Sequence, residues 1–303
     1  MLIKNILVIR NDRFGEFLLN IPALRALKQR YPESSLTLAV SPDTRELAQC
    51  IEYSDRVVVW DDNFRRGLRK QRFDICVVLN PAKEAHWAAF FAGIPIRVGY
   101  NRKWGLLLTH KIEDTKSLGL KHEVEYNLDL AGLIGAKTDD TNLSLAKLPA
   151  YTNPEYAGAV AIHPYTSDSL KQWDPERFRE LAKRVSDELG LQVLIVGKDR
   201  SPGKEEFEGL GKNIVNLVNK TSLVELAQIL KQCRLLVSCD SGPMHLAASV
   251  GTPVIALFRN DLPGKTARRW GPWGKGHIVI EKDKLADIST EEIIKKVRGL
   301  LAK

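Results

Sequence analysis

The segment Asp240-Ser241-Gly242-Pro-Met-His245 combines an acid, a hydroxyl and an imidazole at the point where an apolar run ends and an Ala-rich helix begins. Backbone N–H groups at a helix start have no partner within the helix, so the turn at Ser241 and Gly242 is suited to binding a pyrophosphate. A lone histidine is more often structural, but His245 shares this first turn with Asp240. We therefore interpret the segment as a phosphate-binding helix start.

A second candidate lies near the N-terminus, where the sequence Arg-Asn-Asp12-Arg-Phe-Gly15-Glu16 follows the apolar run Ile6–Ile9. Gly15 permits a tight turn, and Glu16 falls in the first turn of the next helix, where a carboxylate is favoured. Such a carboxylate could accept a proton from a bound hydroxyl. The structural alternative is that Asp12 is a helix N-cap and that Glu16 only interacts with the helix dipole.

The loop between His163 and Trp173 carries Thr166, Ser167 and Lys171. These hydroxyl and ammonium groups follow a strand and suit an anionic ligand, although a solvated loop has the same composition. The helix after this loop should begin with Asp174 as its N-cap and a proline in its first turn.

A weaker signal follows the apolar run Val193–Val196, where Gly197 precedes several acidic residues. A carboxylate at this place could bind the diol of a ribose, and Asp199 and Glu205 are the candidates. Because the spacing is loose, the segment indicates ribose binding by a carboxylate but does not decide between the two residues.

The elements around these segments alternate between short apolar strands and amphipathic helices. This order predicts parallel sheets covered by helices on both faces. The segment Leu148–Gly158 is rich in Pro, Tyr and Gly and is expected to link two domains, residues 1–152 and 153–303, with a C-terminal helix that could pack back on the first. The expected strands are Ile6–Ile9, Leu36–Val40, Val57–Trp60, Ile75–Leu79, Val160–His163, Val193–Val196, Ile214–Asn216, Leu235–Ser238 and Val254–Phe258, and the clearest helices Phe17–Arg30, Pro175–Leu189 and Leu223–Lys231.

Composition sets broad limits on function. The 303 residues carry a formal net charge of +8, which suits anionic partners, and 44% of them are hydrophobic, as in ordinary globular proteins. The cysteines have no metal-ligand spacing, and Cys76 is expected to be buried. The longest apolar stretch, Leu246–Phe258, is shorter than the ~20 residues of a membrane span. We expect a cytoplasmic protein with at most peripheral membrane contact.

In these motifs and their order, the sequence resembles glycosyltransferase family 9, the heptosyltransferase-like enzymes of lipopolysaccharide synthesis. The likeness covers about Lys4 to Trp273, and the Asp-Ser-Gly-Pro-Met-His block is its most specific part. The four stretches that carry it are IRNDRFGEFLLNIPALRALKQRYP, FDICVVLNPAKEAHWAAFFAGIPIRVGYN, LKQWDPERFRELAKRV and SCDSGPMHLAASVGTPVIALF.

The resemblance implies a fold class and a reaction. The fold is α/β of the GT-B type, with two Rossmann-like domains whose parallel sheets face each other across a cleft. The first domain would bind the acceptor, for which we name Arg10, Arg13 and Lys83, and the second the nucleotide-sugar. The reaction would be inverting and independent of a metal or other cofactor, and the chain contains no Asp-x-Asp diphosphate handle and no Gly-x-Gly-x-x-Gly fingerprint.

Two positions depart from the family pattern. The first motif usually reads Gly-Asp, with that Asp as the expected base, whereas this chain has Gly15-Glu16, and Asp12 is the rival base. After the last strand the family usually has Phe-Gly, whereas here Arg259 follows Phe258. Arg259 could pair with a phosphate or signal a different donor.

The combined hypothesis is sugar transfer from a nucleotide diphosphate, with ADP-heptose as the family's best-known donor, to a lipopolysaccharide-core or related glycan. Glu16 or Asp12 would be the base, and Lys171 with the helix amides near Ser241 would stabilise the leaving diphosphate. Asp240 and His245 would position the phosphate loop, Thr166 and Ser167 would contact the donor, and Asp199 or Glu205 would hold the ribose.

Alternatives from other classes remain. The departures at the cleft are compatible with a non-catalytic sugar-nucleotide-binding relative, whereas nucleic-acid binding has no recognised module to support it. The basic run that begins at Arg65 is either a solvated helix face or a contact for an anionic lipid-linked acceptor at the inner membrane surface. Its cations are Arg65, Arg66, Arg69, Lys70 and Arg72.

Overall fold

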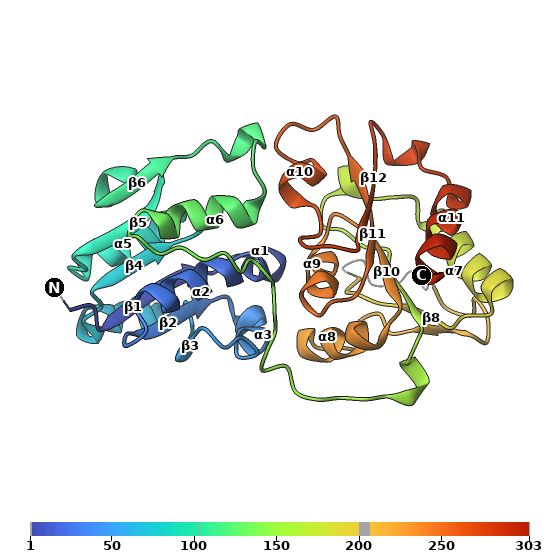
Figure 1. Cartoon of the computed structure of the whole chain (residues 1–303), viewed down its shortest axis with the longest axis horizontal. Coiled ribbons are helices and arrows are strands. Elements are labelled where there is room, and N and C mark those ends of the chain that lie inside the picture. Colours follow the sequence, from blue (N-terminus) through green and yellow to red (C-terminus); the bar gives the residue numbers. More distant parts are fainter. Residues whose placement is uncertain (1, 103, 200–206, 303) are drawn as a thin grey trace. The chain divides into compact units, whose positions relative to one another are not determined.

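The computed structural model describes residues 2–102, 104–199 and 207–302, and the chain divides into two compact units, Met1–Lys147 and Leu148–Lys303. The predicted boundary after residue 152 lies a few residues beyond the observed division. Each unit contains one six-stranded sheet in which every strand pair is parallel (Figure 1).

The first sheet has the strand order β3-β2-β1-β4-β5-β6. Residues 6–9 and 75–78 in its two central strands are apolar and fully buried, as expected for a parallel sheet covered on both faces. Strands β5 and β6 were not expected from the sequence. The strands are β1 (Asn5–Arg10), β2 (Ser35–Val40), β3 (Arg56–Val59), β4 (Ile75–Val78), β5 (Ile96–Asn101) and β6 (His110–Glu113). The helices are α1 (Phe14–Leu18), α2 (Ile21–Arg30), α3 (Arg45–Ala48), α4 (Asp62–Gly67), α5 (Lys83–Phe91) and α6 (Glu123–Gly132), with 3-10 turns η1 (Pro42–Thr44), η2 (Leu68–Gln71), η3 (Gly105–Leu107) and η4 (Lys116–Leu118).

The single helix expected over residues 17–30 is two helices, so that prediction was wrong at residues 19–20, where the helix is interrupted. Helix α1 ends at Leu18, and α2 begins at Ile21 with Pro22 in its first turn. Proline has no N–H to continue the helical ladder. The Asn20 amide instead donates to the backbone oxygens of Glu16, at 2.6 Å, and Phe17, at 3.2 Å. This break fixes the short helix that carries Glu16.

The second sheet has the order β12-β11-β10-β7-β8-β9. All the strands expected in this half are present, and β12 is an additional edge strand. The strands are β7 (Val160–His163), β8 (Val193–Ile195), β9 (Ile214–Asn216), β10 (Leu235–Cys239), β11 (Val254–Arg259) and β12 (Ile278–Lys282). The helices are α7 (Pro175–Leu189), α8 (Leu223–Gln232), α9 (Gly242–Ser249), α10 (Ala267–Trp270) and α11 (Thr290–Leu301), with 3-10 turns η5 (Pro154–Tyr156), η6 (Ser169–Lys171) and η7 (Leu285–Asp287).

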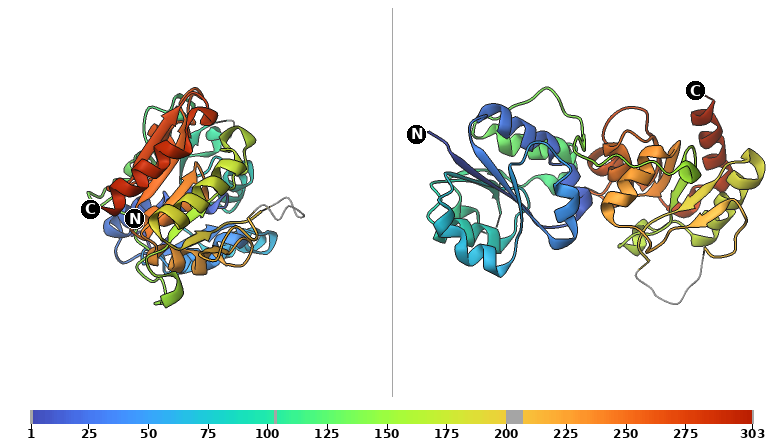
Figure 2. Two further views of the ribbon diagram at one scale, coloured as in Figure 1. Left: turned by 90° about the vertical axis from the view of Figure 1, so that its right-hand side faces the viewer. Right: turned by 90° about the horizontal axis from the view of Figure 1, so that it is seen from below.

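The core of the second unit is organised around Trp173, which is fully buried and donates its indole N–H to the Ile288 carbonyl at 3.1 Å. Asp174 caps α7 by accepting from the Glu176 amide, as predicted. Helix α11 buries Ile293, Ile294 and Val297 in this same core, beside α7 (Figures 1 and 2). The C-terminal helix is therefore part of the second unit's own core.

The topology brings the motifs to defined places. In each sheet the strand order reverses between the first and fourth strands of that unit, β1 and β4 or β7 and β10. Ligands of such sheets bind outside the carboxyl ends of the strands at this reversal. The segments after β1 and β4 hold Glu16 and Lys83, and those after β7 and β10 hold Lys171 and Asp240.

The four cysteines, Cys76 among them, are free thiols buried in the two units. No helix among the described residues is long and apolar enough to cross a membrane.

Candidate active site

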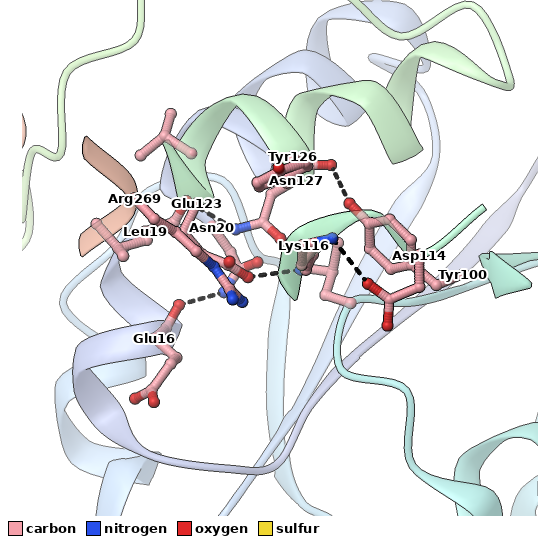
Figure 3. A network of polar contacts seen from close by, with 12 residues as sticks. Glu16, Leu19, Asn20, Tyr100, Asp114, Lys116, Glu123, Tyr126, Asn127 and Arg269 are labelled. Atoms are coloured by element: carbon pink, nitrogen blue, oxygen red, sulfur yellow. Dashed lines mark hydrogen bonds and ion pairs between the residues drawn. The ribbon is translucent and has the colours of Figure 1, made fainter. Parts of the chain in front are cut away.

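Glu16 occupies the first turn of α1, as the sequence predicts. Burial raises the pKa of its carboxyl group above the usual value, while the Arg10 guanidinium acts in the opposite direction. Figure 3 shows the carboxylate pointing away from the polar network behind it, to which Glu16 contributes only its backbone oxygen. A partly desolvated carboxylate with an elevated pKa is suited to accept a proton near neutral pH.

Asp12 is not the N-cap of α1. The N-cap residue of α1 is Arg13, and it makes no side-chain cap. The Asp12 carboxylate instead accepts from Nε of Arg10 at 2.6 Å. The N-cap interpretation of Asp12 was therefore wrong.

Arg10, predicted to bind an acceptor, is almost fully buried at 3% exposure. Besides Asp12, its guanidinium donates to the Leu79 carbonyl at 3.2 Å and lies 3.8 Å from Oε1 of Glu123. Arg10 thus acts inside the first unit, where it holds Asp12. Arg13 and Lys83, the other two candidates for acceptor contacts, are exposed at the starts of α1 and α5.

Lys116 and Glu123 form a buried ion pair in the first unit that was not predicted from the sequence. Nζ of Lys116 donates to Oε1 of Glu123 at 2.5 Å, and the two side chains are 8% and 2% exposed. The same ammonium lies 4.4 Å from the ring centre of Tyr100, whose hydroxyl donates to the Tyr126 carbonyl (Figure 3). The pair connects η4 and α6 to the Arg10–Asp12 contact through Glu123.

In the second unit, Lys171 and Asp240 form a partly buried ion pair and hydrogen bond between the loop after β7 and the end of β10. Both residues were predicted for the donor site, and the structure brings them together across 69 positions of sequence. Asp240 therefore orients the ammonium group of Lys171, whose side chain is 20% exposed. Thr166 forms a local turn with Asp168, and Ser167 is exposed beside it.

His163, at the end of β7, contacts two serine hydroxyls, one on β10 and one at the start of α9. Its Nδ1 lies 3.1 Å from the hydroxyl oxygens of both Ser238 and Ser241, which are 2.8 Å apart. Burial lowers the pKa of His163 to about 3, so the ring is neutral at physiological pH. Ser241 is the N-cap residue of α9 but makes no side-chain cap, because its hydroxyl belongs to this cluster.

The ring of His163 also packs against Gly197, where the loop after β8 begins. A Cβ at Gly197 would lie 2.5 Å from Cδ2 of His163, and the residue has a φ of +125°. Only glycine combines this conformation with so close an approach. Asp199 follows, with its N–H on the Asn219 side-chain oxygen at 3.1 Å. Glu205 lies outside the described residues.

Helix α9 begins at Gly242, as predicted, and Pro243 is its second residue. The N–H of Gly242 belongs to the helix start, whereas Pro243 has none to offer. His245 is 3% exposed and lies on the buried side of this first turn. Among the described residues, no group of three or more His, Cys, Asp or Glu side chains is arranged to hold a metal ion.

Comparison with known proteins decides the family. Residues 62–297 match the model of glycosyltransferase family 9 (heptosyltransferase). The chain belongs to this family. It is 26% identical to lipopolysaccharide heptosyltransferase 2 of Escherichia coli, over 86% of this chain and 84% of that protein.

The family's solved structures share the fold of this glycosyltransferase. The E. coli ADP-heptose lipopolysaccharide heptosyltransferase II superposes with a TM-score of 0.81 at 23% identity, over 98% of both chains. The E. coli heptosyltransferase WaaC with ADP-2-deoxy-2-fluoro heptose gives 0.79 at 17% identity, over 97% of this chain and 99% of that one. The two Rossmann-like units are therefore those of the GT-B fold.

Arg259, where the family pattern usually has glycine, forms a two-point contact with the carboxylate of Asp261. Its Nη1 also donates to the Leu170 carbonyl at 3.3 Å, next to Lys171. Arg259 thus supports the loop that carries Lys171, and much of its charge is balanced by Asp261.

Sequence reasoning missed His163, Ser238, Lys116 and Glu123 as parts of the site. His163 was named only as the start of a loop, although its place at the end of a central strand is a usable signal. The Lys116–Glu123 pair lies in a segment whose composition resembles a solvated loop, and no local pattern marks it as buried.

Proposed function

We propose that this glycosyltransferase moves heptose from ADP-heptose to a hydroxyl of a lipopolysaccharide-core or related glycan, with inversion at the anomeric carbon and without a metal ion. The donor and the acceptor class are supported by the names of the related heptosyltransferases. The observation that carries the proposal is the Lys171–Asp240 pair beside the start of α9, at the strand-order reversal of the second sheet.

In the proposed reaction, the acceptor oxygen forms a bond to the anomeric carbon as the bond from that carbon to the diphosphate oxygen breaks. Glu16 takes the acceptor's proton, and ADP leaves with the bonding electrons. A single displacement from the face opposite the leaving group inverts the configuration. General-base assistance of this kind contributes roughly 10²- to 10⁴-fold in rate.

Glu16 is favoured over Asp12 as the base because of what each carboxylate contacts. The Asp12 carboxylate accepts a charge-assisted hydrogen bond from buried Arg10, which commits it to a contact inside the first unit. The pKa of Glu16 is instead raised by burial. We assign Asp12 to the positioning of the segment that follows β1.

The donor is assigned to the second unit. Lys171, held by Asp240, would neutralise charge that develops on the diphosphate, and the N–H of Gly242 would donate to a phosphate oxygen. Thr166 and Ser167 would add hydroxyl contacts, His245 would support the helix start from its buried side, and Asp199 would hold the ribose. In this scheme the ammonium group of Lys171 and the start of α9 balance the diphosphate charge, a task that a carboxylate-bound metal ion would otherwise perform.

The acceptor is assigned to the first unit, with Arg13 and Lys83 as its exposed cations. The basic run of α4 and η2 would contact anionic headgroups at the cytoplasmic face of the inner membrane. Arg65 is paired with Asp62 within this run, and the other four cations, Arg66, Arg69, Lys70 and Arg72, are exposed. Each cation near an anionic surface adds about 1 kcal/mol.

A panel of ADP-, GDP-, UDP- and dTDP-sugars in a thermal-shift assay, followed by transfer assays with the best donor, tests the proposal. We expect ADP-heptose to raise the melting temperature most, because a ligand of the native state stabilises it by mass action. Transfer should persist in EDTA and give an inverted glycosidic linkage by NMR. Donor binding without transfer or hydrolysis would instead support a non-catalytic sugar-nucleotide-binding protein.

A further inference from the structure

An exposed group of apolar side chains lies on the first unit, at the end of α5 and on η3. Phe90 and Phe91 are 43% and 67% exposed, and Leu106 is 73% exposed. The rings of Trp87 and Phe91 stack with centroids 5.2 Å apart, and Trp87 lies 5.2 Å from Trp104. We call these five residues the aromatic surface.

The aromatic surface is not the outer edge of a core. Helix α5 already buries Ala85, His86 and Ala89 against its unit. An amphipathic surface helix normally turns polar residues outward, but the last turn of α5 turns Phe90 and Phe91 outward instead. Two adjacent exposed phenylalanines, of which Phe91 stacks on Trp87, form the kind of apolar patch that marks an interaction site.

Cations lie directly at the aromatic surface. Nζ of Lys83 is 5.1 Å from the ring centre of Trp104, and the guanidinium of Arg97 is 5.4 Å from that of Phe90. Arg97 is held there by its hydrogen bonds to the carbonyls of Leu107, at 2.6 Å, and Ile94. The exposed acids of the surrounding elements include Glu84, Glu113 and, at the start of α4, Asp61 and Asp62. Glu113 accepts a hydrogen bond from Asn101, and Asp62 pairs with Arg65.

The basic run adjoins the same helix. Segment η2 contacts α5, and Leu68 of η2 shares a core cluster with Ala85 and Ala89 of α5. The cations Arg69 and Lys70 therefore project from an element packed directly on the helix that presents Phe90 and Phe91. Apolar rings next to clustered cations match a bilayer interface, in which rings enter the acyl boundary and cations remain among anionic headgroups.

We propose that the aromatic surface is a membrane-insertion site, with Phe90, Phe91 and Leu106 entering the interface of an anionic bilayer and Lys83, Arg97 and the basic run contacting its headgroups. The choice of a bilayer rests on charge complementarity between these cations and anionic lipid. The inference extends the proposed function by placing the enzyme where a lipid-anchored acceptor is found, but insertion itself requires no sugar transfer.

Co-sedimentation with phosphatidylethanolamine vesicles, with and without phosphatidylglycerol, tests the site. The double variant Phe90→Ser/Phe91→Ser removes two exposed rings, so it should fold normally. The control is Tyr151→Ser/Val279→Ser, which removes two exposed apolar side chains, 45% and 41% exposed, from the second unit. We expect the wild type and the control to bind phosphatidylglycerol-containing vesicles, and the Phe90/Phe91 variant to bind them at least tenfold more weakly.

Equal vesicle binding by the Phe90/Phe91 variant and the wild type would overturn the inference. So would a wild-type dimer in solution that this variant converts to a monomer, because a second copy would then be the occupant. Transfer to a delipidated, water-soluble acceptor separates the two proposals. The variant should retain that transfer, whereas a wild type that binds vesicles but transfers no sugar would contradict only the proposed function.

Discussion

The contact between His163 and Gly197 gives a quantitative prediction about how the second unit is assembled. Replacement of Gly197 by alanine puts a Cβ 2.5 Å from Cδ2 and 2.7 Å from Nε2 of His163, and does so at a φ of +125°. The backbone conformation alone should cost about 1–3 kcal/mol, and overpacking against a buried ring another ~1–3 kcal/mol.

Replacement of His163 by alanine is destabilising for a different reason. It leaves a cavity, and it removes the ring nitrogen that contacts Ser238 and Ser241. Loss of a buried hydrogen-bond partner costs about 1–3 kcal/mol. The missing ring, however, vacates the space that a Cβ at residue 197 would occupy. The double variant should therefore be more stable than the sum of the two single losses implies, by about 1–3 kcal/mol, since only the steric part of the Gly197→Ala cost is relieved.

Urea unfolding of the full-length wild type, both single variants and the double variant, followed by circular dichroism, measures this coupling energy. Alanine is a large enough replacement for Gly197, because its Cβ alone reaches the ring of His163. ADP affinity in the same four proteins gives a second readout, and both single variants should weaken it. Losses that add within ~0.5 kcal/mol would refute the claim that the ring and Gly197 are in contact.

Three further predictions concern the two units separately. Glu16→Gln should raise the melting temperature at pH 7, because the folded-state pKa of Glu16 is raised by burial and its charge therefore destabilises the fold above that pKa. The gain should vanish in melts below the unfolded-state pKa, near 4.5, and a gain that persists there would contradict this cause. Lys171→Met should lower kcat by roughly 10²- to 10³-fold in steady-state assays, while Asp240→Asn, which keeps the lysine, should lower it less; equal effects would argue against a positioning role for Asp240. Trp173→Ala should destabilise the second unit by about 3–5 kcal/mol in urea unfolding, because the ring is fully buried, and a loss below ~1 kcal/mol would show that Trp173 does not organise that core.

Much of the fold could be predicted because the buried strands are continuous apolar runs. The strands that were missed lack this pattern for physical reasons. Strand β6, His110–Glu113, alternates half-buried and exposed residues at a sheet edge, and β12 is likewise an edge strand, with a polar C-terminal end. Strand β5 includes Arg97, whose guanidinium turns back to carbonyl groups of neighbouring turns.

The candidate site was predictable where function follows from position in the chain. Glu16, Lys171 and Asp240 stand after strands, and the topology of parallel sheets brings such residues to one edge. Pairings between distant residues could not be predicted in this way. No local pattern indicates that the Ser241 hydroxyl contacts His163 instead of capping α9, or that Asp12 contacts Arg10 instead of capping α1.

The assignment of Glu16 as the base is the central claim, and single-turnover transfer with saturating ADP-heptose and a heptose acceptor tests it most directly. Glu16→Gln should reduce the rate by roughly 10²- to 10⁴-fold while ADP binding is retained, and Asp12→Asn should reduce it less. In the wild type, the rate should fall as the pH drops through the raised pKa of Glu16, which must be ionised to accept a proton. A Glu16→Gln enzyme that transfers heptose at nearly the wild-type rate would contradict the account.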